Sequence, residues 1–94
     1  MKPPNHLKAP AKKFWNEMMQ DYEIDDAGGL ALLQAACEAY QRSHEARKTI
    51  NKEGAVIKDR FGQLKPHPAT SIERDARGQL ITALRALKLA PGGE

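Results

Sequence analysis

Histidine, cysteine and adjacent carboxylates are the residue types in this chain that could bind a metal ion or transfer a proton. The three histidines and the single cysteine, Cys37, are scattered along the chain, so their spacing does not match a zinc site. The adjacent acids Asp25 and Asp26 are better explained as a helix cap than as an acid-base pair. We therefore expect no catalytic residues, no metal site, no cofactor and no enzyme activity, and we expect Cys37 to be a core residue more readily than a reactive thiol.

Lysine and arginine give the one usable functional signal, because their side chains can contact the phosphates of DNA. The net charge is only +3, but residues 1–13 carry four lysines and no acid, whereas residues 14–26 carry five acids and no base. The candidate DNA-binding residues, which Lys65 could join, are Lys2, Lys8, Lys12, Lys13, Arg42, Arg47, Lys48, Lys52, Lys58 and Arg60. A solvated surface with local ion pairs, such as Glu38 with Arg42, is the competing interpretation.

A long helix between Asp26 and Gly54 is the element most able to position these residues. Asp26 can accept hydrogen bonds from the first turn, and Gly54 can adopt the left-handed conformation that ends a helix. At ~1.5 Å per residue, such a helix is about 40 Å long. Its apolar residues form two neighbouring stripes. The first stripe contains Leu33, Cys37, Tyr40 and His44, and the second contains Leu32, Ala36, Ala39, Ser43, Ala46 and Ile50.

Together the two stripes cover more than half of this helix, which is more apolar surface than two short neighbouring helices would bury. This excess indicates self-association. The residues expected to contact another copy are Leu32, Ala36, Ala39 and Ile50 of the long helix and Ile81 of the last helix. The basic N-terminus could also meet the acidic stretch of a neighbouring copy head to tail, although two solvated patches explain the charge split equally well.

The segment before the long helix predicts an arm followed by a first helix. Residues 1–9 combine prolines with lysines and predict a flexible basic arm. Phe14, Met18 and Tyr22 repeat every four residues in a helix that begins at Pro10 and ends near residue 22 or 23. We expect residues 10–91 to form a single helical domain and residues 92–94 to form a tail.

The segment after the long helix predicts a short connection and a last helix. Residues 55–65 predict either two short strands joined by a turn or a loop held by Phe61. Pro68 suits the first turn of the last helix, and Thr70-x-x-Glu73 offers a capping box two residues later. His67 is expected to order this start, and Leu89 to end the helix. The fold class is therefore mainly α, a three-helix protomer with a long central helix and a short β-hairpin or loop before the last helix, assembling into a ring.

Gly78 stands inside the predicted last helix, where glycine costs about 1 kcal/mol relative to alanine. A close contact with another helix would explain a glycine at this position. Simple tolerance of the unfavourable residue would explain it equally well.

A series of short motifs, in a fixed order, resembles the small terminase subunit of tailed bacteriophages, of the compact all-helical type. The resemblance runs from about residue 7 to residue 91 and is most specific at Gly54, at the segment after it and at His67-Pro68-Ala69. The motifs are Ala11-Lys12-Lys13-Phe14-Trp15, Asp25-Asp26, Ala36-Cys37-Glu38-Ala39-Tyr40, Glu53-Gly54, Asp59-Arg60-Phe61-Gly62, Lys65-Pro66-His67-Pro68-Ala69 and Leu84-Arg85-Ala86-Leu87-Lys88-Leu89.

This resemblance implies a non-enzymatic DNA-packaging factor. Such a protein forms a ring, engages double-stranded viral DNA near its packaging start, and regulates the ATPase and nuclease of the large terminase subunit in the cytoplasm of the infected bacterial host. No apolar run approaches the ~18 residues of a membrane span, so we expect no membrane partner. The competing hypothesis is a helical adaptor from a phage, satellite or prophage that binds only other proteins.

Overall fold

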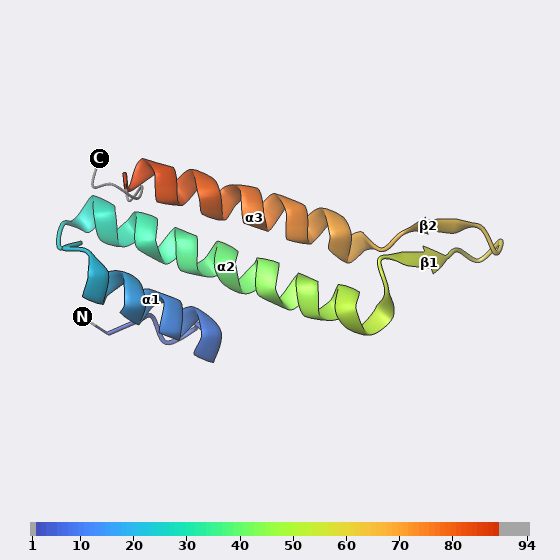
Figure 1. Cartoon of the computed structure of the whole chain (residues 1–94), viewed down its shortest axis with the longest axis horizontal. Helices are drawn as coiled ribbons and strands as arrows, with labels where there is room; N and C mark the ends of the chain where they lie inside the picture. The colour runs from blue at the N-terminus through green and yellow to red at the C-terminus, as the bar shows by residue number, and fades with distance from the viewer. Residues whose placement is uncertain (1, 89–94) are drawn as a thin grey trace.

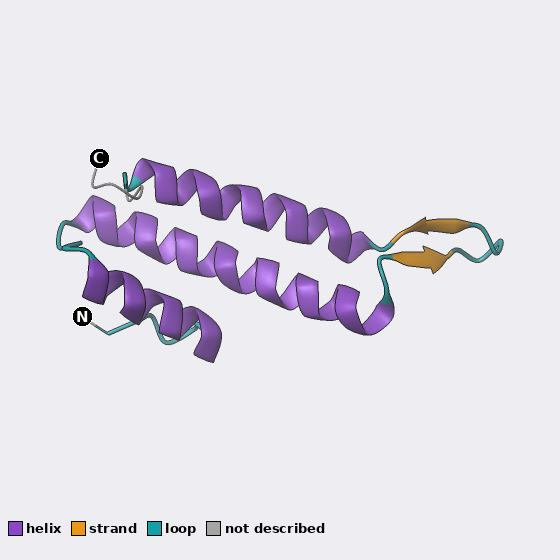
Figure 2. Cartoon of the chain, in the orientation of Figure 1, coloured by secondary structure: helices purple, strands orange, loops and turns teal. Residues whose placement is uncertain are grey.

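The computed structural model describes residues 2–88, which form three helices and one antiparallel hairpin (Figure 1, Figure 2). Helix α1 spans Ala9–Asp21, α2 spans Ala27–Glu53 and α3 spans Pro68–Ala86. Strands β1 (Val56–Lys58) and β2 (Leu64–Pro66) form the hairpin between α2 and α3. The predicted mainly α fold is confirmed, and the connection before the last helix is a pair of strands rather than a loop.

Helix α2 is the centre of the arrangement, with α3 running antiparallel along one side and α1 along the other (Figure 1). Its ends lie where the sequence predicts them. The Asp26 carboxylate accepts a hydrogen bond from the Gly29 N–H at 2.9 Å, and the Gly54 N–H donates to the Ile50 carbonyl at 2.7 Å. Gly54 has a φ of +90°, a conformation that strains any residue with a Cβ atom.

The first stripe of α2 packs against α1. Leu33 and Cys37 are fully buried, and they form the main apolar cluster with Trp15 of α1. At the edge of this cluster the ring of Phe14 stacks on Tyr40, with centroids 4.8 Å apart. The periodicity of α2 therefore predicted this face correctly, and α1 is the element that covers it.

The second stripe of α2 is a seam of small side chains against α3. The buried residues of this seam are Ala36, Ala39 and Ala46 of α2 and Ala69, Ala76 and Ala83 of α3. Ser43 lies on the same face of α2, and its hydroxyl donates to the Glu73 carboxylate of α3 at 3.3 Å. Because alanine side chains end at Cβ, the two helices can pack closely along this seam.

This seam corrects the predicted oligomer interface. Ala36 is 0% exposed and Ala39 is 1% exposed, so neither is available to a second copy. The prediction that these two residues contact a neighbouring subunit is wrong, because α3 of the same chain covers them. Much of the apolar excess of α2 is therefore buried inside the protomer.

The N-terminal segment, residues 2–8, lies along α2 and differs from the predicted flexible arm. Leu7 is only 3% exposed and belongs to the apolar cluster. His6 Nε2 lies 2.8 Å from the Glu38 carboxylate, and the Lys8 N–H donates to the Gln41 side chain at 2.6 Å. Helix α1 then begins at Ala9, one residue before the predicted start.

The start of α3 is fixed by His67. Its Nδ1 accepts a hydrogen bond from the Ala69 N–H at 2.9 Å, and its Nε2 lies 2.8 Å from the Glu53 carboxylate. The ring is thus held as the neutral tautomer, with the proton on Nε2. The predicted capping box is wrong, because the Thr70 hydroxyl donates to the His67 carbonyl and Glu73 contacts α2. The helix ends at Ala86, and the predicted end at Leu89 and the tail 92–94 lie outside the described residues.

The molecule is elongated, with the hairpin at one end and the connection between α1 and α2 at the other (Figure 1). Its radius of gyration is 16.0 Å and its extents are 53 × 27 × 20 Å. A compact domain of this length has a radius of gyration near 12 Å. No helix within residues 2–88 is long and apolar enough to cross a membrane.

Candidate nucleic-acid interface

The hairpin carries cations that no acid in the described chain neutralises. Lys58 ends β1, Arg60 lies in the turn and Lys65 lies on β2. Within residues 2–88, none of these three side chains forms an ion pair, and the Arg60 guanidinium lies 5.2 Å from the ring centre of Phe61. These charges are therefore free to meet an anionic partner.

The strand register places the cations on both faces of the hairpin. Lys58 pairs with Leu64, and Lys65 pairs with Ile57. Paired residues share one face of an antiparallel ladder, while neighbours along a strand alternate between faces. Lys58 and Lys65 consequently project from opposite faces of the hairpin.

Two further free cations, Lys48 and Lys52, lie one turn apart on the exposed side of α2. Residues at this spacing are neighbours on a helix surface. Both line a shallow hollow close to the end of α2, not far along the chain from the hairpin. Neither forms an ion pair with any residue between 2 and 88. Lys48 and Lys52 therefore add two free cations on the helical body, near the end of α2 that leads into the hairpin.

Arg47 is held in a cluster around Glu73. The Glu73 side chain is 9% exposed, and its Oε1 lies 3.3 Å from the Arg47 guanidinium and 3.6 Å from that of Arg77. The Ser43 hydroxyl donates to its other oxygen. This arrangement gives Arg47 a structural role in joining α2 to α3.

Arg42 donates to the Gln79 side chain at 2.5 Å and retains its full charge. Arg42 and Arg47 are five residues apart, about 140° around the helix, and both touch α3. They therefore lie on opposite flanks of α3 and cannot belong to one flat surface.

Of the N-terminal candidates, Lys8 lines the same hollow as Lys48 and Lys52. The Lys8 ammonium forms an ion pair with Glu45 at 2.6 Å, Lys12 is half-buried, and Lys2 and Lys13 are exposed. The structure thus does not assemble the ten predicted residues into one patch. Lys8 and Arg47 are already paired with acids, whereas the hairpin cations and those at the end of α2 form no ion pair within residues 2–88. The same is true of Lys2, Lys12, Lys13 and Arg42.

Sequence reasoning missed the arginines of α3. Arg74, Arg77 and Arg85 are exposed on this helix, and Arg74 lies 3.6 Å from Asp75. The apolar stripe of α3 dominated the interpretation of that segment. The spacing of Arg74 and Arg77, three residues apart on the polar side, was the signal that could have identified them.

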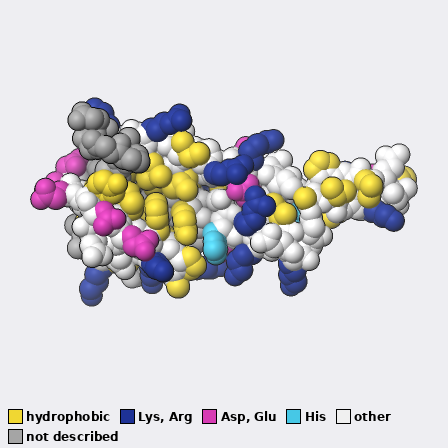
Figure 3. Space-filling model, in the orientation of Figure 1, with side chains coloured by type: hydrophobic (Ala, Val, Ile, Leu, Met, Phe, Trp, Pro, Cys, Tyr) yellow, Lys and Arg dark blue, Asp and Glu magenta, His cyan; other side chains and the backbone are white. Residues whose placement is uncertain are grey.

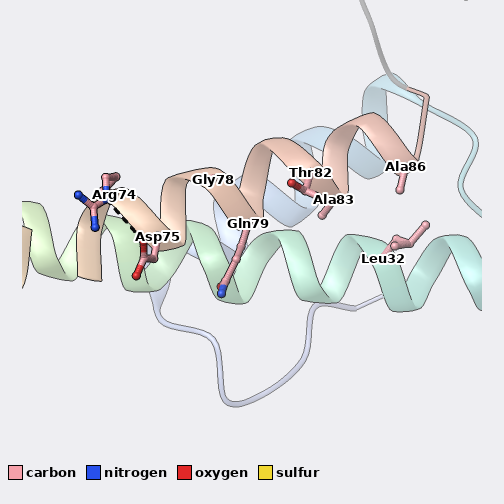
Figure 4. Close-up of a pocket in the computed structure, with 8 residues that line it drawn as sticks. All are labelled: Leu32, Arg74, Asp75, Gly78, Gln79, Thr82, Ala83 and Ala86. Atoms are coloured by element: carbon pink, nitrogen blue, oxygen red, sulfur yellow. Dashed lines mark ion pairs between the residues drawn. The ribbon is translucent and has the colours of Figure 1, made fainter. Parts of the chain in front are cut away.

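Two shallow grooves lie along the contact between α2 and α3. One is lined by Leu32 of α2 and by residues of α3 between Arg74 and Ala86 (Figure 4), and the other includes Arg42 and Ile72. Figure 4 shows Leu32 of α2 opposite Ala83 and Ala86 of α3, with Gly78 along the same helix. A Cβ atom at Gly78 would meet nothing within 4 Å, so no close contact inside the protomer requires this glycine. Of the predicted interface residues, Leu32 and Ile50 are half-buried and Ile81 is 44% exposed.

The end of the molecule opposite the hairpin is acidic. In Figure 3 most of the visible acidic side chains gather there. The exposed acids Asp21, Glu23 and Asp25 form no ion pair within the described residues. Negative charge repels phosphate, so these three acids disfavour contact with nucleic acid at this end.

The cysteine, histidine and aspartate residues considered for metal binding or proton transfer have structural positions in the fold. Cys37 is fully buried, and burial, followed by the charge of Glu38, raises the pKa of its thiol to about 12. His67 caps α3, and Asp26 caps α2. Across residues 2–88, no three histidine, cysteine or acidic side chains are grouped so as to hold a metal ion.

The described chain is thus a mainly helical protein with a long antiparallel helix pair, a projecting hairpin that carries free cations, and an open groove. The family model for the phage terminase small subunit matches residues 11–94, which is most of the chain. The protein therefore belongs to the phage terminase small subunit family, and the assignment drawn from the sequence motifs is confirmed. No curated protein and no solved structure matches the chain significantly.

Proposed function

We propose that this small terminase subunit binds double-stranded viral DNA, assembles with further copies into a ring, and recruits or regulates the large terminase subunit during genome packaging. In this proposal it acts in the cytoplasm of the infected bacterial host and catalyses no reaction itself. Family membership supports the role in packaging. The observation that carries the DNA-binding part is the set of cations without ion pairs at one end of the molecule.

Five side chains make up this basic surface, and each can contact a phosphate without first breaking an ion pair. They are Lys48 and Lys52 at the end of α2 and Lys58, Arg60 and Lys65 on the hairpin. Within one protomer this is a modest charge. In a ring the same surface is repeated in every copy, and binding by several copies to one duplex strengthens the attachment.

Association of copies is supported by the surface that one protomer leaves exposed. The chain of 10.4 kDa exposes 6716 Å². A compact monomer of this mass exposes about 5,400 Å². The groove that contains Leu32 and Gly78, and the exposed Ile81 elsewhere on α3, are the surfaces on which a neighbouring copy can bury part of this excess.

The DNA-binding proposal is tested by replacing Lys48 and Lys52 with alanine together. The affinity of both proteins for a duplex is measured between about 50 and 200 mM salt. For each contacting protomer, loss of two phosphate contacts reduces the slope of log affinity against log salt by about 1.8. Asn51→Ala is the matched control, because it alters an exposed uncharged side chain of the same hollow.

An unchanged slope would remove the end of α2 from the interface. Absence of DNA binding by the unmodified protein at low salt would favour the protein-only adaptor. Arg47→Glu is a poor choice for this test, because it would place a second carboxylate against the buried Glu73.

The assembly proposal is tested by Ile81→Asp, with the native mass measured by light scattering. Ile81 is 44% exposed, so the substitution leaves the protomer folded while it places a charge on the proposed contact surface. We expect a lower mass. Asn16→Asp adds the same charge on the exposed side of α1 and should leave the mass unchanged. If both variants retain the mass of the unmodified protein, Ile81 does not belong to the contact.

A further inference from the structure

The turn of the hairpin holds an aromatic side chain in solvent. Phe61 is 76% exposed, more than any other large hydrophobic residue in the described chain. We propose that Phe61 is a wedge that enters the minor groove of double-stranded DNA, partly unstacks one base step and bends the duplex. This inference rests on the proposed DNA-binding function and adds a residue and a mode of contact to it.

Hydrogen bonds within the turn hold the backbone form that presents Phe61. One oxygen of Asp59 accepts hydrogen bonds from the N–H groups of Phe61 at 2.8 Å and Gln63 at 3.0 Å. The Asp59 N–H donates to the Gln63 carbonyl at 2.8 Å, and Gly62 has a φ of +80°. A contact residue that is already fixed loses little conformational entropy on binding. The same hydrogen bonds direct the Asp59 carboxylate toward the backbone of the turn.

The hairpin is also fixed where it leaves the helices. The His67 N–H donates to the Ala55 carbonyl at 2.8 Å, directly beside the pair Val56 and Pro66. His67 in turn contacts Glu53 at the end of α2 and caps α3. A hairpin anchored to both helices can transmit a bending force to the DNA, because its base does not swing freely.

The charge distribution favours a groove over a flat protein surface. Lys58 and Lys65 project from opposite faces of the hairpin, with Arg60 at the turn beside Phe61. A segment inserted into a DNA groove has a phosphate backbone on each side, so cations on both faces can make contacts at once. A segment lying on a protein surface would use only one of these faces.

The reach of the hairpin is sufficient for this contact. Three steps along the chain separate Val56 from Asp59, where the turn begins, which is about 10 Å at ~3.3 Å per residue, and Phe61 lies in the turn at the end of this span. The minor groove of B-DNA is about 7.5 Å deep. Phe61 can therefore reach the base edges while the helices remain outside the phosphates. Apolar side chains that insert in this way widen the groove and kink the duplex by about 20–90°.

The test uses Phe61→Ala in the full chain and a 30-base-pair duplex with a central TA step, since such steps unstack readily. The duplex carries 2-aminopurine beside this step, whose fluorescence rises on unstacking, and a fluorescence energy transfer pair at its ends. We expect the unmodified protein at saturation to raise the 2-aminopurine signal and bring the ends closer. Phe61→Ala should lose both signals and bind on the order of tenfold more weakly. The salt dependence should not change, because no charge is removed.

Two variants provide controls. Phe61→Leu keeps an apolar wedge and should retain part of both signals. Tyr22→Ala removes a partly exposed aromatic ring at the opposite end of the molecule and should retain both in full. Circular dichroism of each variant checks that the helices are intact.

Three results would overturn the proposed wedge, and they differ in whether the proposed DNA-binding function fails with it. If Phe61→Ala bends and unstacks the duplex as the unmodified protein does, the wedge is wrong while DNA binding stands. If Phe61→Ala lowers the native mass and leaves the DNA signals unchanged, the turn contacts another copy of the chain. If the unmodified protein does not bind the duplex at low salt, the wedge and the proposed function both fail.

Discussion

The contacts of Glu73 lead to a prediction about the stability of the helix pair. Its side chain is 9% exposed, faces Arg47 at 3.3 Å and Arg77 at 3.6 Å, and accepts a hydrogen bond from Ser43 at 3.3 Å. Glu73→Ala removes all of these contacts from the seam between α2 and α3. We therefore expect the variant to be markedly less stable than the unmodified protein.

The size of the effect follows from the environment of the partners. Hydrogen bonds to charged groups contribute about 1.5–3 kcal/mol. The Arg47 and Arg77 side chains are 51% and 56% exposed, so water can solvate both after the change. Solvation reduces the loss below that of a fully buried pair, and we expect about 2 kcal/mol. For a domain of this length, that corresponds to a fall in Tm of about 8–16 °C.

The assay is urea unfolding followed by circular dichroism, supported by thermal unfolding. Asp75→Ala is the matched control, since it removes an acid of α3 that is 67% exposed and lies 3.6 Å from Arg74. The control should change stability by less than about 0.5 kcal/mol. Equal stability of Glu73→Ala and Asp75→Ala would refute the role assigned to the buried carboxylate.

Two further predictions concern the buried thiol and the N-terminal segment. Cys37 is fully buried, and burial raises the pKa of its thiol to about 12. A thiol reagent at pH 8 should therefore modify Cys37 only at the rate of global unfolding. Rapid modification of the folded protein would contradict the buried position of Cys37. The hydrogen bond from Gln34, with that from His6, lowers the pKa of Glu38 in the folded protein. The ionised Glu38 carboxylate therefore stabilises the fold at neutral pH, and this stabilisation is lost as the pH falls through the folded-state pKa. Glu38→Gln should therefore lower the urea midpoint at pH 7, and its effect should shrink as the pH falls below the ordinary glutamate pKa of about 4.3. An effect that stays constant as the pH falls would show that charge is not the cause.

The helix boundaries and the faces of α2 were predictable because local signals determine them. Asp26 and Gly54 carry the cap chemistry themselves, and the two apolar stripes follow from the helical period. The hairpin could be anticipated from Val56 and Ile57 ahead of a turn sequence, although the sequence left a loop open as an alternative. His67 was also correctly expected to order the start of α3.

The features that the sequence did not predict depend on partners distant along the chain. Leu7 is a single leucine among prolines and lysines, so it gives no period, yet it reaches the core and positions the N-terminal segment. Glu73 matches a capping box locally, but its partners Ser43 and Arg47 lie 30 and 26 residues earlier. For the same reason, the sequence did not predict which cations of the candidate site form ion pairs. The acids that pair with Lys8 and Arg47 lie on other elements.

The central claim is that this terminase small subunit holds duplex DNA through cations that remain unpaired within the protomer. It is tested most directly by the affinity of the full chain for a 30-base-pair duplex as a function of salt. If Lys48, Lys52, Lys58, Arg60 and Lys65 all contact phosphates, log affinity falls with log salt at a slope of about −4.5 or steeper. Between about 50 and 200 mM salt the affinity then drops at least roughly 500-fold. A flat dependence, or no binding at low salt, would contradict the claim.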